Sequence, residues 1–327
     1  MTDTALERAI RSQPEELQRL ASLPMPHDVV ERLRQCRRIW LVGTGTSLHA
    51  AELGASMLHQ AGRGAQAVPS MQFVNWAPPV HPQDGVLVIS HNAGAETAYA
   101  LAAYAQARDA GLRVVAITRQ GGGLPNALET VPKERSQTYT VSYTAALLLL
   151  ARLAHELGAP DFGPEVVDRV PGAVRAAIEA PGTGSIAEPR RTLLLVGEGP
   201  ASVTAREGAL KLREGSRLLA EGYDVEYLLH GSAVPLDGDD HLLALSPPDT
   251  DGLVGAVASA AEAEGVRVTH LAEPADLPPI LAQIPLTVRL QLLALRLAAE
   301  RGEDPDMVIT GAWADDRLWA LGAPEHP

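Results

Sequence analysis

Three ionisable residues share one face of a predicted helix. Glu207, Lys211 and Glu214 are spaced i, i+4 and i+7, so their side chains lie above one another on that face. The chain has 27 basic residues, and of these only Lys133 and Lys211 are lysines. Lysine has a compact ammonium whose protonation responds to burial, whereas the guanidinium of arginine stays charged. An ammonium between two carboxylates can donate hydrogen bonds to them and change its protonation state on burial, which makes Lys211 a candidate functional residue.

Two glycines on this helix favour a ligand-binding role, but the spacing of the charges also fits an ordinary exposed helix. Gly208 and Gly215 flank the charged face, and their lack of side chains predicts room for a ligand. A solvated ladder of Glu–Lys pairs has the same spacing on an ordinary exposed helix. The spacing therefore leaves both a catalytic face and a solvated face open. The same holds for His230, which follows two leucines and fits either a functional histidine or an ordinary loop histidine.

Hydroxyl-rich turns in the first half are candidate phosphate contacts. Gly45-Thr46-Ser47 follows an apolar run and opens a helix, where backbone N–H groups bind anions. It is neither a dinucleotide fingerprint, because Leu48 stands at the third glycine, nor a Walker loop. Two more polar stretches contain Ser90, His91, Asn92 and Thr97, and Ser136 and Thr140. We expect the three stretches to converge on one phosphate, although each alone also fits a helix cap or a surface turn.

Strands that alternate with helices must position these side chains. Apolar runs predict strands, and amphipathic or apolar stretches predict helices between them. The strands are expected over 38–43, 65–73, 85–90, 113–118, 192–197, 241–246 and 266–271, with a further strand and loop over 221–230. The helices are expected over 4–21, 28–36, 48–60, 96–110, 140–157, 165–179, 202–220, 253–264 and 287–301. The order recurs in the second half. The sequence therefore predicts an α/β protein of two doubly wound parallel sheets in tandem, each flavodoxin-like with three αβα layers.

Changes in composition predict the domain boundaries. Residues 1–160 should form an N-terminal helix and the first domain, which carries the phosphate-binding turns. Residues 161–189 are rich in proline and glycine and should connect the two domains. Residues 190–327 should form the second domain, with the catalytic helix and a C-terminal tail.

Composition excludes several classes of function. The formal net charge of −13 argues against nucleic acid and against an anionic membrane surface as partners. No apolar run reaches the length of a membrane span, and the N-terminus has no signal-peptide core, so we expect a cytoplasmic protein. The single cysteine, Cys36, excludes an intrachain disulfide framework. Metal-binding spacings such as HExxH and CxxC are absent, so we expect neither a metal nor a cofactor.

These pieces, in this order, resemble the sugar isomerase (SIS) family. The chain is most similar to the double-SIS isomerase part of glucosamine-6-phosphate synthase and to stand-alone amino-sugar-phosphate isomerases and deaminases. The residues that carry the resemblance are the run from Glu207 to Glu214, the segment from Ala220 to Gly231, Gly45-Thr46-Ser47, and the stretch from Glu134 to Thr144. The resemblance covers nearly the whole chain.

The resemblance implies a phosphosugar isomerase or deaminase of carbohydrate metabolism that works by proton transfer between C1 and C2. It implies Glu214 as the base, Lys211 as its partner at the open-chain sugar, and His230 for ring opening from the neighbouring subunit of a homodimer. The 6-phosphate of an amino sugar, ketose or aldose would be bound by hydroxyls of the first half, here Thr46, Ser47, Ser90 and Thr140.

The chain departs from the family pattern in its phosphate turns. Asn92 stands where a serine is expected, and the family's Ser-Thr-Lys falls on Tyr139-Thr140-Val141. Two basic residues near the C-terminus of the synthase fall on Ile309 and Trp313. The synthase's glutaminase domain has no counterpart, so glutamine-dependent amination is not expected. A non-catalytic sugar-phosphate sensor therefore remains an alternative, and a nucleotide-dependent Rossmann enzyme is a third.

Overall fold

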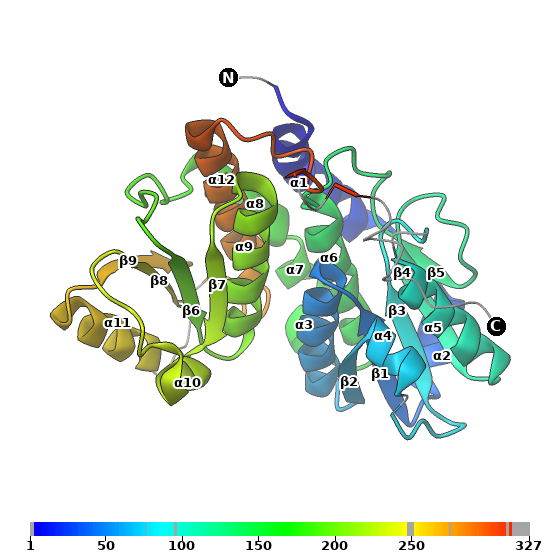
Figure 1. Ribbon diagram of the computed structural model, residues 1–327. Helices are drawn as coiled ribbons and strands as arrows, with labels where there is room; N and C mark the ends of the chain where they lie inside the picture. Colours follow the sequence, from blue (N-terminus) through cyan, green and yellow to red (C-terminus); the bar gives the residue numbers. More distant parts are fainter. Residues whose placement is uncertain are drawn as a thin grey trace. The chain divides into compact units, whose positions relative to one another are not determined.

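The computed structural model describes residues 3–76, 78–94, 97–246, 252–274, 276–311 and 314–315 (Figure 1). The chain divides into two compact units. The first-sheet unit contains Glu15–Glu134, Val141–Asp168 and the chain from Ile309 onward. The second-sheet unit contains Met1–Pro14, Arg135–Thr140 and Arg169–Val308. This division differs from the expected one, because Met1–Pro14 and Arg135–Thr140 belong to the unit built on the second sheet.

The first-sheet unit is built on a parallel sheet of five strands in the order β2-β1-β3-β4-β5. Its strands are β1 (Arg38–Gly43), β2 (Gly64–Pro69), β3 (Gly85–Ile89), β4 (Arg113–Thr118) and β5 (Ala127–Glu129). Its helices are α2 (His27–Arg34), α3 (Thr46–Gln60), α4 (Ser70–Asn75), α5 (Ala98–Asp109), α6 (Val141–Glu156) and α7 (Pro164–Val167), and α1 (Ala5–Ser22) contributes its second half. The short 3-10 helix η2 (Pro160–Phe162) precedes α7.

The second-sheet unit is built on a parallel sheet of four strands in the order β7-β6-β8-β9. Its strands are β6 (Leu193–Gly197), β7 (Ala220–Asp224), β8 (His241–Ser246) and β9 (Arg267–Ala272). Its helices are α8 (Val170–Glu179), α9 (Pro200–Ser216), α10 (Val225–Tyr227), the turn η3 (Leu228–Ser232), α11 (Leu253–Ala263) and α12 (Gln283–Arg301). Both units are therefore α/β with parallel sheets, and their first four strands have the same spatial order.

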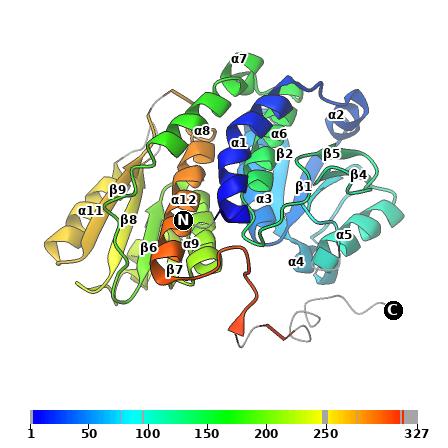
Figure 2. The same ribbon diagram turned by 90° about the horizontal axis from the view of Figure 1, so that it is seen from above.

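Helices cover both faces of each sheet (Figure 2). In the first-sheet unit, Trp40 and Val42 of β1 pack with Tyr104 of α5, and the intervening Leu41 faces α3. In the second-sheet unit, Leu193 and Leu195 of β6 pack with α9 and α12, and the alternate residues Leu194 and Val196 pack with α11. The strands are apolar on both faces because both faces are buried, as expected of parallel sheets.

Some element boundaries differ from those expected. The predicted strand over 65–73 ends at Pro69, and α4 turns Phe73 back into the core of the first-sheet unit. Helix α9 ends at Ser216 and not near Ala220, because Arg217 adopts the left-handed conformation that terminates it. The expected connecting segment 161–189 is no separate linker. Its residues up to Asp168 belong to the first-sheet unit, and those from Arg169 belong to the second-sheet unit.

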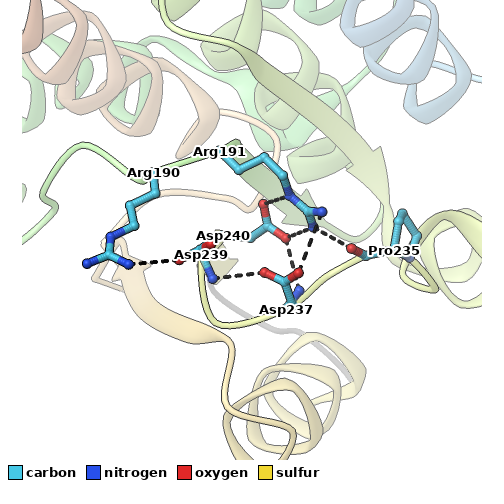
Figure 3. Close-up of polar contacts among 6 residues, drawn as sticks. All are labelled: Arg190, Arg191, Pro235, Asp237, Asp239 and Asp240. Carbon is cyan, nitrogen blue, oxygen red and sulfur yellow. Dashed lines mark hydrogen bonds and ion pairs between the residues drawn. The ribbon is translucent and has the colours of Figure 1, made fainter.

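Each of the two sheets has an Arg–Asp ion pair at its amino-terminal edge. In the second sheet, Arg191 Nε donates to Asp240 Oδ1 at 2.9 Å, and Asp237 and Pro235 lie around the same guanidinium (Figure 3). In the first sheet, Arg37 Nε donates to Asp84 Oδ1 at 3.0 Å. Both arginines stand six residues before the glycine that ends their strand (Gly43 and Gly197), and both aspartates immediately precede β3 or β8. Each pair thus joins the starts of two neighbouring strands, β1 and β3 in the first sheet and β6 and β8 in the second.

None of the helices in the described part of the chain combines the length and the apolar character that crossing a membrane requires.

Candidate active site

Helix α9 carries the three ionisable residues on a face that is almost completely buried. It begins after Gly199, whose φ of 51° and ψ of −126° match the φ of 53° and ψ of −129° of Gly45 before α3. Near its start, Thr204 Oγ1 donates to Gln283 Oε1 of α12 at 2.7 Å. Helix α12 packs along the apolar face of α9, which includes Ala205, Ala209 and Leu212, and the charged face is itself buried at Glu207 and Lys211.

Lys211 lies between two carboxylates. Its Nζ is 2.6 Å from Glu214 Oε2 and 3.6 Å from Glu207 Oε1. The side chains of Lys211 and Glu207 are 0% exposed, whereas that of Glu214 is 20% exposed. A buried ammonium with two carboxylate partners is the arrangement that makes burial of such charges tolerable. The interpretation of a solvated ladder is therefore wrong, and Glu214 is the most exposed member of the cluster.

Both glycines of α9 face other protein atoms, and close packing requires glycine at Gly208. A Cβ on Gly208 would lie 2.5 Å from Leu290 Cδ1 and 2.8 Å from Leu195 Cδ2, so its absence lets α9 approach α12 and β6. A Cβ on Gly215 would lie 3.7 Å from Ala294 Cβ and 3.9 Å from Pro305 Cβ. Protein atoms occupy the space beside both residues. The expectation that these glycines leave room for a ligand is therefore wrong.

The cluster does not lie at the carboxyl edge of the second sheet. Helix α9 starts at that edge with Pro200 and runs back along the sheet, so Glu214, in its last turn, lies roughly 20 Å further along the helix axis. Sequence reasoning examined the strand-to-helix turns because parallel sheets bind ligands there. The positions of Glu214 and Lys211 are instead set by the C-terminal end of α9 and by the segments packed around it.

His230 lies on an exposed loop of the second-sheet unit. It belongs to η3, and its backbone φ of −87° and ψ of 39° depart from helical values. Tyr227 and Leu229 beside it are 66% and 53% exposed. Within the described residues, the His230 ring has neither a hydrogen bond nor an ion pair. The structure therefore leaves it accessible and does not join it to Lys211 or Glu214.

Two of the three hydroxyl stretches follow neighbouring strands of the first sheet. Strands β1 and β3 pair in parallel, so the turns after Gly43 and after Ile89 lie at the same edge. Gly45 is exposed, and Thr46 and Ser47 are half-buried at the start of α3. A Cβ on Gly43 would lie 2.5 Å from the carbonyl oxygen of Ser47, so this tight turn requires glycine.

Hydrogen bonds within the second turn hold it together. Ser90 Oγ lies 2.9 Å from Thr97 Oγ1 and accepts the N–H of Ala93 at 3.2 Å. Ser90 is buried, whereas Asn92 and Thr97 are half-buried. The hydroxyls of Ser90 and Thr97 are thus adjacent, at the carboxyl edge of the first sheet.

His91 of this turn connects it to α6. Its Nε2 accepts the backbone N–H of Glu134 at 3.1 Å, and the carboxylate of Glu134 accepts the N–H of Ser142 at 2.9 Å in the first turn of α6. Burial lowers the pKa of His91, as do Arg119 and Lys133, while Glu134 raises it. The neutral imidazole is the form that accepts an N–H at Nε2. Sequence reasoning missed this role of Glu134, which no local pattern signals.

The third stretch belongs to the other unit and is buried. Ser136, Thr138 and Thr140 are 2%, 1% and 0% exposed. Ser136 Oγ and Thr138 Oγ1 donate to the carbonyl of Pro305 at 3.3 and 2.8 Å. This carbonyl belongs to the residue whose Cβ faces Gly215 at the end of α9. The stretch is therefore packed beside α9, and not in the unit that carries the other two turns.

The described residues offer no group of three His, Cys, Asp or Glu side chains that could hold a metal ion. Cys36 is buried, and burial raises the pKa of its thiol to about 11, so it is a poor nucleophile at neutral pH. Of the two positions where the synthase carries basic residues, Ile309 is described, and Trp313 lies outside the described residues.

Comparison with protein families places residues 32–156 in a match to the model described as SIS domain. This range contains the first sheet, and the second sheet lies outside it. The glutamine–fructose-6-phosphate aminotransferase (isomerizing) of Thermococcus kodakarensis is 28% identical over an alignment of 312 residues that covers 85% of this chain and 52% of the relative. The chain thus spans about half the length of the curated relatives that it matches.

Solved structures with the same fold cover nearly the whole chain. The C-terminal domain of glucosamine-fructose-6-phosphate aminotransferase from Francisella tularensis aligns with a TM-score of 0.75 at 21% identity, over 93% of this chain and 98% of that one. Tagatose-6-phosphate ketose/aldose isomerase from Escherichia coli aligns with a TM-score of 0.78 at 19% identity, over 95% and 98%. Glucosamine-6-phosphate deaminase from Thermotoga maritima aligns with a TM-score of 0.75 at 19% identity, over 93% and 97%.

Proposed function

We propose that this chain is a phosphosugar isomerase or an amino-sugar-phosphate deaminase that acts without a glutaminase. The observation that carries the proposal is the buried ammonium of Lys211 held between Glu207 and the partly exposed Glu214. A deeply buried charged cluster with a single accessible carboxylate suits a base that meets its substrate at a defined point. The similarity to proteins named for sugar-phosphate isomerisation and deamination supports the same class of substrate.

The chemistry requires two proton movements. Converting an aldose phosphate into a ketose phosphate takes one proton from C2 and one from O2, and adds one proton to C1 and one to O1. In our proposal, Glu214 accepts the C2 proton and returns it to C1 through an enediol. Lys211 orients the Glu214 carboxylate by a charge-assisted hydrogen bond and supplies positive charge beside the enediolate. His230 would assist ring opening, and its exposed loop supports an approach from a second subunit of a homodimer.

The phosphate would bind at the carboxyl edge of the first sheet. We assign it to Gly45, Thr46, Ser47, Ser90, Asn92 and Thr97, with His91 fixing the second turn. The hydroxyls of Ser136 and Thr138 already bind Pro305, so contacts from that stretch would require rearrangement. Of that stretch we assign Thr140 to the phosphate, because it directly precedes α6.

We also propose that the second sheet forms a second SIS-type unit. Three repeated features support this: the strand order, the left-handed glycine before α3 and α9, and the Arg–Asp pair at the amino-terminal edge. If the second sheet were unrelated to the first, all three features would have to agree by chance.

The test is exchange of the C2 proton in D2O with hexose and hexosamine 6-phosphates, followed by NMR. The wild-type protein should exchange this proton, whereas Glu214→Gln should lose exchange and keep the thermal shift that the ligand produces. Exchange that persists in Glu214→Gln would remove Glu214 from the mechanism.

A non-catalytic sugar-phosphate sensor is the second candidate. The buried carboxylate of Glu134 favours it, because that carboxylate already occupies the N-terminus of α6, where an anion would otherwise bind. A thermal shift with hexose 6-phosphates, without any C2 exchange in the wild-type protein, would identify the sensor.

A further inference from the structure

The residue that ends α9 has an unusual backbone. Arg217 adopts φ 56° and ψ 20°, the left-handed conformation in which helices usually carry glycine. This conformation costs free energy in a residue with a side chain, so it persists only where contacts with the surrounding structure offset that cost. Arg217 stands three residues after Glu214, so the residue that closes the helix also borders the proposed base.

The side chain of Arg217 connects the last turn of α9 to a distant segment of the same unit. Its Nη1 donates to the carbonyl of Glu214, and its Nη2 donates to the carbonyl of Met307 and lies 3.5 Å from that of Asp304. The forked guanidinium can hold two backbone segments at once, which a single ammonium cannot. A cation at this position also complements the carbonyl end of the helix.

The segment 304–308, which we call the clasp, binds two further parts of the second-sheet unit. The Pro305 carbonyl accepts the hydroxyls of Ser136 and Thr138 at 3.3 and 2.8 Å. The Asp306 carboxylate accepts the first two N–H groups of α1, from Ala5 and Leu6, each at 2.7 Å.

Gln137 completes the attachment to the clasp. Its N–H donates to the Asp306 carbonyl at 2.9 Å, and its side-chain oxygen accepts the N–H of Val308 at 2.8 Å. The clasp therefore holds the hydroxyl stretch 135–140 and the start of α1 against one surface. Arg217 is the residue through which the end of α9 joins this arrangement.

We propose that Arg217 is a positioning residue for Glu214. It fixes the Glu214 backbone by tying the last helical turn to the clasp, and so sets the point from which the exposed carboxylate reaches its substrate. The proposal rests on the function proposed above for Glu214. Fixing the base matters because a small displacement of a catalytic group lowers the rate of the chemical step far more than it weakens binding.

Arg217→Gly separates positioning from folding. Glycine favours the left-handed backbone, which offsets part of the loss of the guanidinium hydrogen bonds, so this variant should fold and melt within a few degrees of the wild type. We expect kcat for C2 exchange to fall about 10-fold, with KM within about twofold, because the base is displaced while the phosphate turns are intact. Added guanidinium should restore part of the rate, and Arg217→Lys, which keeps the charge but not the fork, should lie between the two.

The control is Arg190→Ala, which removes an arginine whose side chain is 84% exposed and far in sequence from α9's end. It should leave kcat and the melting temperature unchanged. An unchanged kcat in Arg217→Gly would overturn the proposal, and so would a loss of rate that only follows a lower melting temperature. If the wild-type protein exchanges no proton with any sugar phosphate, the proposed function fails instead. Amide hydrogen exchange then decides the positioning: faster exchange at Gln137 and Val308 in Arg217→Gly supports the link to the clasp, and unchanged exchange overturns it.

Discussion

Lys211 donates a 2.6 Å hydrogen bond to Glu214, from a side chain that is 0% exposed to one that is 20% exposed. The pair therefore bridges the protein interior and its accessible surface within one turn of α9. Glu207, on the interior side, lies 3.6 Å from the same ammonium and is itself 0% exposed. The interior partner anchors Lys211, and the exposed partner can meet a ligand. The two carboxylates therefore differ in role, and Glu207 depends on Lys211 for its charge to remain buried.

Replacing Lys211 by methionine should destabilise the protein severely. The variant leaves the Glu207 carboxylate buried beside an apolar side chain, and breaking a buried pair in this way costs about 3–5 kcal/mol. Urea denaturation at neutral pH measures the loss. Lys133→Met removes the other lysine, which is exposed, and should stay within about 0.5 kcal/mol of the wild type.

The double variant Glu207→Gln/Lys211→Met separates stability from activity. It should recover part of the lost stability, because no unpaired charge remains buried, while C2 exchange stays absent. A cost below about 1 kcal/mol for Lys211→Met alone would contradict the buried pairing.

Gly208→Ala should destabilise the protein through crowding. The added methyl would lie 2.5 Å from Leu290 Cδ1, so α9 and α12 must separate or Leu290 must change rotamer. Overpacking of this kind costs about 1–3 kcal/mol, and urea denaturation measures it. Gly172→Ala is the matched control: Gly172 lies on an exposed part of α8 with open space at its Cβ, so alanine should stabilise by up to about 1 kcal/mol. Equal effects of the two substitutions would contradict the packing role of Gly208.

The sequence predicts the strands and the charged helix well because both depend on local patterns. Apolar runs such as Leu193–Val196 identify buried strands, and i, i+4, i+7 spacing places Glu207, Lys211 and Glu214 on one face. The spacing does not decide whether that face is buried, because burial depends on segments that pack on α9 from elsewhere in the chain. The same dependence on distant segments explains the incorrect interpretation of Gly208.

Contacts between distant loops could not be predicted from the sequence. His91 accepts an N–H from Glu134, 43 residues further on, and Ser136 donates to Pro305, 169 residues further on. No periodicity connects such residues. Arg217 shows the same limit, because its left-handed backbone is stabilised by the clasp and not by its own residue type. The general rule that glycine ends helices predicts against arginine at that position.

The two aspartates at the amino-terminal edges of the sheets should make stability depend on acid pH. Hydrogen bonding to Arg191 holds the pKa of Asp240 below its usual value, and burial opposes this. For Asp84, burial raises the pKa, but hydrogen bonds from His81, Trp40 and Arg37 outweigh it and lower the pKa overall. Both groups therefore bind protons more weakly in the folded protein than in the unfolded chain.

The sign of the effect follows from this difference. Each carboxylate stabilises the fold fully above its unfolded pKa of about 3.9, and the contribution is lost as the pH falls through the lower folded-state value. Asp84→Asn and Asp240→Asn should each cost about 1–3 kcal/mol at neutral pH and reduce the loss of stability below about pH 5. Urea denaturation at a series of pH values measures both. Asp109→Asn, at a side chain that is 70% exposed, should change neither quantity. An Asn variant with wild-type stability at neutral pH would contradict the role of that aspartate.

His91 should make binding of the sugar phosphate sensitive to pH. Burial, together with Arg119 and Lys133, holds its pKa below the usual value despite the opposing effect of Glu134. The folded state therefore favours the neutral ring, which accepts the N–H of Glu134 at Nε2. As the pH falls below the unfolded pKa of about 6.5, the unfolded chain takes up a proton more readily than the folded protein, so the stabilising contribution is lost. Protonation also turns Nε2 into a donor that faces another donor, which should release the turn that holds Ser90.

His91→Gln tests this linkage. A glutamine oxygen can accept the same N–H without titrating, so the variant should bind phosphate at neutral pH and lose less affinity between about pH 7 and pH 5. Isothermal titration with a hexose 6-phosphate at several pH values measures the difference, corrected for titration of the phosphate itself with the free ligand. His27→Gln, at an exposed histidine of α2, should follow the wild-type profile. If His91→Gln and the wild type lose affinity in parallel, protonation of His91 does not control the turn, and the acid sensitivity belongs to the ligand or to another group.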